Sequence, residues 1–72
     1  MSRSTDNVIR LLKAGGSLSI NCDDRSTDNV LRIIKTANAV GNSITLRNLD
    51  DHSTDNVLRI IKASGDNILL EV

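Results

Sequence analysis

The stretch Ser4–Lys13, which reads STDNVIRLLK, occurs three times in this 72-residue chain with little change. The second and third copies, Ser26–Lys35 and Ser53–Lys62, both read STDNVLRIIK. We call this stretch the STDN motif and count its ten positions from the serine. The copies begin 22 and then 27 residues apart, which indicates one structural unit built three times. Recent duplication and deliberate engineering would both produce copies this similar.

Each STDN motif carries the features of an amphipathic helix. Its serine is a helix N-cap candidate, and the aspartate two residues later lies where the helix dipole favours a carboxylate. At about 100° per residue, the apolar positions five, six, eight and nine fall on one arc. Asp6, Arg10 and Lys13 share the opposite face, where Asp6 and Arg10 are spaced for an ion pair within the helix.

Short apolar segments lie between the motifs and alternate as half-buried strands do. The predicted strands are 17–22, 43–47 and 67–72, with Ile20, Ile44, Leu46, Leu70 and Val72 among the inward residues. Asn48 breaks the alternation after the second strand, which predicts a β-bulge there. Leu69 is the apolar exception on the outward face. The predicted helices end near Gly15, Gly41 and Gly65, and the second is longer by about one turn.

Alternating helices and strands with short turns predict an α/β fold with parallel strands and right-handed crossovers. Because one face of each strand is polar, we expect three helices on one face of a three-stranded parallel sheet. Strand order 1-2-3 is the simplest arrangement, and 2-1-3 is the alternative. The whole chain, 1–72, is predicted to be one domain of three repeats, at about 3–24, 25–51 and 52–72.

The strand segments Leu18-Ser19-Ile20 and Ile44-Thr45-Leu46 are similar to the Leu-x-Leu core of leucine-rich repeats. Asp23 and Leu49 stand where that family has its ladder asparagine, and Gly15 and Gly41 stand where it has a leucine. The chain therefore resembles the family loosely, as a short α/β solenoid. The resemblance implies a stacked geometry and a protein-binding habit rather than membership.

Composition excludes several function classes. Nine Lys and Arg balance nine Asp and Glu, so no net positive field attracts nucleic acid. No apolar run is long enough to cross a membrane, and no secretory peptide is evident. The single cysteine, Cys22, fits a reducing cytoplasm. With neither aromatic residues nor proline, the core must consist of Val, Ile and Leu, 22 residues in all.

The turns that follow the first two strands are acidic and form the best candidate site. They contain Asp23 and Asp24 in one repeat and Asp50 and Asp51 in the next. Carboxylates at one sheet edge would suit a divalent metal, although the same acids also complement the adjacent helix N-termini. Cys22 is expected in the core and His52 at the surface. A nucleophile–base pair of these two requires the turns to meet in space and lacks an orienting third group.

The leading hypothesis is therefore a non-enzymatic repeat module without a cofactor. We expect it to form homo-oligomers or to bind a protein partner through its open sheet edges. Neither nucleic acid nor membrane is expected as a partner. A divalent-metal-binding module that uses the acidic turns is the alternative function.

Overall fold

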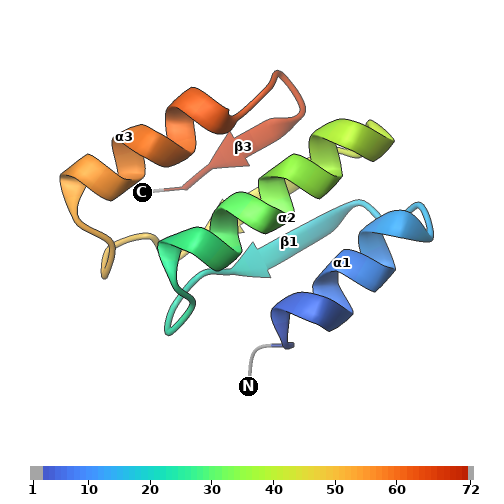
Figure 1. Cartoon of the computed structure of the whole chain (residues 1–72), viewed down its shortest axis with the longest axis horizontal. Coiled ribbons are helices and arrows are strands. Elements are labelled where there is room, and N and C mark those ends of the chain that lie inside the picture. Colours follow the sequence, from blue (N-terminus) through green and yellow to red (C-terminus); the bar gives the residue numbers. More distant parts are fainter. Residues whose placement is uncertain (1–2, 72) are drawn as a thin grey trace.

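Helices and strands alternate along the chain in the computed structural model, which describes residues 3–71 (Figure 1). The six elements are α1 (Thr5–Lys13), β1 (Leu18–Asn21), α2 (Thr27–Val40), β2 (Ile44–Arg47), α3 (Thr54–Ala63) and β3 (Ile68–Leu70). Each is within two residues of its predicted limits, apart from Val72, which lies outside the described residues. The predicted α/β fold is confirmed.

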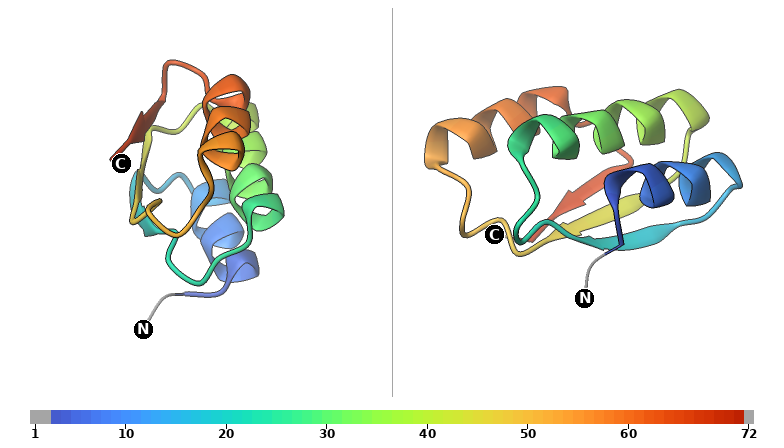
Figure 2. Two further views of the ribbon diagram at one scale, coloured as in Figure 1. Left: turned by 90° about the vertical axis from the view of Figure 1, so that its left-hand side faces the viewer. Right: turned by 60° about the horizontal axis from the view of Figure 1, so that its bottom comes forward.

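The three strands form one parallel sheet in the order β1-β2-β3. Leu18, Ile44 and Ile68 lie opposite one another in register, and so do Ile20, Leu46 and Leu70. The alternative order 2-1-3 is therefore excluded. Viewed from the side, all three helices cover the same face of the sheet and the other face is open (Figure 2). Helix α2 lies between α1 and α3.

The serine of each STDN motif caps its helix as predicted. Ser4, Ser26 and Ser53 have extended backbone conformations, and their hydroxyl oxygens accept hydrogen bonds from the backbone N–H groups three residues later at 3.1–3.2 Å. These contacts satisfy one of the N–H groups that every helix start leaves without a partner. The motif serine thus fixes where each helix begins.

The three helices end differently. Helix α2 has 14 residues against 9 and 10 in α1 and α3, and it stops at Gly41 in the left-handed conformation (φ 78°). The predicted extra turn is thereby confirmed. Helix α3 ends at Ser64, whose backbone is extended and whose hydroxyl donates to the Ile60 carbonyl oxygen at 2.7 Å. The predicted end near Gly65 is therefore confirmed to within two residues, with Ser64 as the cap.

The sheet and the helices bury an aliphatic core between them. Its residues come from all six elements and from two turns: Val8, Leu12, Ile20, Cys22, Val30, Ile33, Ile34, Ala37, Ile44, Leu46, Leu49 and Ile60 are buried, and Leu70 is half-buried against them. Most of the fully buried residues belong to α2 and β2, because these two elements have neighbours on both sides. Burial of the core is therefore most complete around α2 and β2, the central helix and the central strand.

The predicted β-bulge at Asn48 is not what the structure shows. Strand β2 ends at Arg47, and Asn48 follows it in the left-handed conformation (φ 59°). This one extra residue returns Leu49 to the core, where it takes the place that Cys22 occupies after β1. Asparagine tolerates positive φ better than most residues, which explains why it stands here.

Candidate functional site

The acidic turns after β1 and β2 come together at one edge of the sheet. Asp23, Asp50 and Asp51 line one surface hollow with Asn48, which donates from Nδ2 to Asn21 Oδ1 at 2.8 Å. Among residues 3–71, however, no group of three or more Asp, Glu, His and Cys side chains is arranged to hold a metal ion. The geometry gives the metal-binding alternative no further support.

Asp51 lies close enough to Asp23 to change the pKa of the Asp23 carboxyl group. The pKa of Asp23 is raised above 3.8, first because of a side-chain hydrogen bond with Asp51 and then because of the charge on that carboxyl group. Protonation of Asp23 therefore stabilises the folded state relative to the unfolded state. Its stabilising contribution is complete below pH 3.8 and is lost as the pH rises through the raised pKa.

Asp23→Asn is expected to raise the melting temperature slightly at pH 7, because it removes the repulsion between two ionised carboxylates. The difference from the unsubstituted chain should shrink as the pH falls towards 3.8. Circular-dichroism melts across this pH range measure both effects. Asp66→Asn, at an exposed aspartate in another turn, is the matched control. A D23N chain that melts lower than wild type at pH 7 would contradict the assignment.

Cys22 and His52 are neighbours, but they do not form a nucleophile–base pair. The Cys22 thiol is fully buried, and burial raises its pKa. The His52 ring contacts the Cys22 backbone carbonyl oxygen through Nε2 at 3.2 Å and Thr27 Oγ1 through Nδ1 at 2.9 Å. The two ring nitrogens therefore join the turn before α3 to the turn after β1 and to the first residue of α2. The prediction that Cys22 belongs to the core is confirmed.

The charged outer face of the helices is exposed as predicted, but its ion pairs run between helices rather than within them. Arg32 Nη2 lies 3.1 Å from Asp6 Oδ1, and Arg59 Nη2 lies 3.6 Å from Asp28 Oδ1. Asp6 was expected to pair with Arg10 of its own helix. In each observed pair the arginine belongs to the seventh motif position and the aspartate to the third position of the preceding motif.

The apolar arc is not buried equally in the three helices, although the three motifs are nearly identical in sequence. Leu11 in α1 is 38% exposed, whereas Leu58 and Ile61 in α3 are 49% and 48% exposed. The equivalent residues of α2 are buried or half-buried. The signal that would have revealed this is topological, since the first and last helices of a one-sided stack each lack one neighbour.

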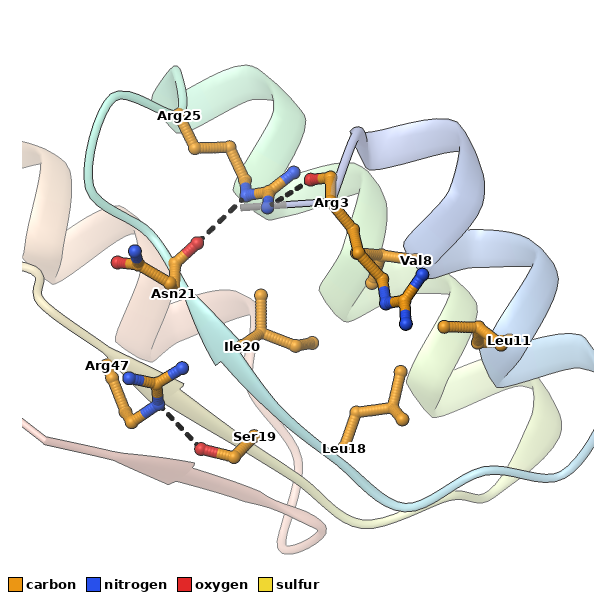
Figure 3. Close-up of a pocket in the computed structure, with 9 residues that line it drawn as sticks. All are labelled: Arg3, Val8, Leu11, Leu18, Ser19, Ile20, Asn21, Arg25 and Arg47. Carbon is orange, nitrogen blue, oxygen red and sulfur yellow. Dashed lines mark hydrogen bonds between the residues drawn. The ribbon is translucent and has the colours of Figure 1, made fainter. Parts of the chain in front are cut away.

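The exposed side of α1 borders a hollow of about 350 Å³ beside the free edge of β1. Figure 3 shows Val8 and Leu11 on the α1 side of this hollow and Leu18 and Ile20 on the strand side. Arg25 closes one end, where its guanidinium donates to the carbonyl oxygens of Asn21 at 3.2 Å and Arg3 at 2.8 Å. The hollow thus lies beside the core at the open edge of the sheet, with Leu11 and Leu18 as its more exposed apolar walls.

No helix among residues 3–71 is long and apolar enough to cross a membrane. Comparison of the chain with protein-family models, curated proteins and solved structures finds no match. The function of the chain is therefore inferred from its own geometry.

Proposed function

We propose that this chain is a non-catalytic interaction module that associates with itself through the two open ends of its stack. One observation carries the proposal: Leu11 at one end, and Leu58 and Ile61 at the other, are exposed although they belong to the arc that is covered in α2. Exposed apolar side chains that adjoin a buried core are a common mark of an interface.

The open strands support the same function. Among the described residues, β1 and β3 each pair with β2 alone, so they form the two edges of the sheet. Such an edge offers backbone N–H and C=O groups to a further strand, apart from Asn21 of β1, whose carbonyl oxygen accepts from Arg25. A strand from another protein can pair with such an edge, and apolar pockets beside it then add affinity. In this chain the hollow between α1 and β1 is such a pocket.

The size of the domain is a second source of support. Small domains bury a smaller share of their surface than large ones, so a chain of 72 residues gains much from covering its open ends. Association through both ends would extend the core without any rearrangement of the fold. Solenoid proteins are stabilised by contacts between neighbouring repeats in this way.

Sedimentation velocity over a range of concentrations tests the proposal. We expect the mean mass to rise with concentration above that of a 7.8 kDa monomer. The unfolding midpoint should also rise with concentration, because association stabilises the folded state by mass action. A chain that stays monomeric at high micromolar concentration, with a midpoint independent of concentration, would refute self-association.

A further inference from the structure

We propose that chains stack head to tail, with the α3–β3 end of one chain docked on the α1–β1 end of a second. This inference rests on the proposed self-association and specifies its geometry. We call each helix together with the strand that follows it a unit. Four kinds of contact recur between successive units inside the chain. At each end of the chain, one partner of every such contact has no counterpart.

The first recurring contact is apolar. Positions six and nine of the motif are covered in α1 and α2 but exposed in α3, as Leu58 and Ile61 show. Position eight is covered in α2 and α3 but exposed in α1, as Leu11 shows. Positions six and nine therefore face the following unit, and position eight faces the preceding one. The two exposed ends are the two halves of one interface, and the hollow beside Leu11 has room for side chains of α3.

The second contact is electrostatic. Each internal interface pairs an arginine with an aspartate of the preceding helix, as in Arg32–Asp6 and Arg59–Asp28. Among the described residues, Arg10 of α1 and Asp55 of α3 form no ion pair. Docking α3 against α1 of a second chain would bring these opposite charges into the same relation. The ends are thus complementary in charge as well as in shape.

The third contact joins each turn to the threonine at position two of the preceding motif. Arg25 Nη1 donates to Thr5 Oγ1 at 2.8 Å, and His52 Nδ1 lies 2.9 Å from Thr27 Oγ1. The series continues at the ends, because Arg3 stands before the first motif as Arg25 stands before the second. Thr5 is buried beneath Arg25, whereas Thr54 is exposed. Arg3 of a second chain would cover Thr54.

The fourth contact is the sheet itself. If the internal register continues, Ile68 of one chain lies opposite Leu18 of the next, and Leu70 lies opposite Ile20. The strands would then run in the order β1-β2-β3-β1-β2-β3, all parallel. Because the two surfaces differ, this interface is heterologous, and its repetition gives an open filament or a closed ring rather than a symmetric dimer.

Two single-end variants test this geometry. Leu11→Glu blocks the α1 end and Ile61→Glu blocks the α3 end, each by placing a carboxylate in the apolar contact. Each variant alone should associate about tenfold or more weakly than wild type. An equimolar mixture should form 1:1 dimers and nothing larger, because each variant keeps one intact end. Val40→Glu, at an exposed apolar residue of the central helix α2, is the matched control.

Native mass spectrometry of the variants and of their mixture distinguishes the possible outcomes. If Ile61→Glu abolishes association but Leu11→Glu does not, the chains meet through like ends and the head-to-tail geometry is wrong. The reverse result would place two α1 ends together and would equally overturn it. A monomeric wild-type chain would refute the proposed function as well. The two single-variant results would overturn only the head-to-tail geometry, and the proposed self-association would stand.

Charge reversal provides a second test with residues that are already exposed. Asp55→Arg also removes a favourable carboxylate from the first turn of α3, so its folding is checked separately by circular dichroism. Arg10→Asp and Asp55→Arg should each weaken association, and the double variant should recover much of it. Lys13→Asp changes the charge of the same helix equally, and the double variant that combines it with Asp55→Arg should not recover association. Recovery in the Lys13 combination, or none in the Arg10 combination, would contradict the proposed contact.

Discussion

Ile34→Ala is expected to lower the free energy of unfolding by about 2–5 kcal/mol, the range found for removing a large aliphatic side chain from a core. Ile34 is fully buried at position nine of the second motif, within the cluster that α2 forms with both neighbouring helices and the sheet. The substitution leaves a cavity that surrounding aliphatic residues fill only in part. For so small a domain this loss is a large fraction of the total stability.

Ile61→Ala is the matched control, since the same residue stands at the same motif position in α3. Ile61 is half-exposed, so its loss should cost at most about 1 kcal/mol in dilute solution. Urea unfolding at low protein concentration measures both variants. Equal destabilisation by the two substitutions would mean that Ile61 is packed as tightly as Ile34, which contradicts their difference in exposure.

Asn42→Ala should have the second-largest effect, about 2 kcal/mol. Asn42 Nδ2 donates to the carbonyl oxygens of Leu12 at 2.8 Å and Gly16 at 2.9 Å. The backbone carbonyl oxygen of Asn42 accepts from Asn67 Nδ2 at 2.7 Å, a contact that alanine would keep. The side chain thereby satisfies carbonyl groups where α1 ends and β1 approaches. Without it, the two carbonyl oxygens each lose a donor, and that of Leu12 keeps the backbone N–H of Gly15.

Thermal unfolding of Asn42→Ala beside Asn38→Ala checks this role. The Asn38 side chain is exposed and donates one hydrogen bond, to the Ala63 carbonyl oxygen at 3.1 Å. Its loss is offset by the better helix propensity of alanine, so we expect a change within about 0.5 kcal/mol. If both variants melt at the same temperature, the contacts of Asn42 contribute little.

Local patterns predicted the elements because each carried its own signals. The motif serines marked the helix starts, the strand segments alternated, and one polar face required helices on the other face alone. These are properties of neighbouring residues in the chain, and no contact between distant residues was needed to infer them. The strand order did not follow in this way, because short connections left both 1-2-3 and 2-1-3 open and only the observed pairing selects 1-2-3.

Those local patterns did not predict the contacts between one unit and the next. Helix spacing pointed to an Asp6–Arg10 pair, but Arg32 of the next helix reaches Asp6 instead. The choice depends on how far apart the helix axes lie, which no single motif encodes. The role of Asn48 was also misjudged, because a residue added beyond the end of a strand and one added within it disturb the alternation alike.

The longer α2 has a consequence for rearranging this chain. Its last turn and the residue after its cap reach both neighbours, through Asn38 to Ala63 and through Asn42 to Leu12 and Gly16. The first and third segments have no such extension. Shuffling the segments, or excising the central one, would therefore remove these hydrogen bonds from the other two. The three motifs are nearly identical in sequence, but the segments that contain them are not interchangeable.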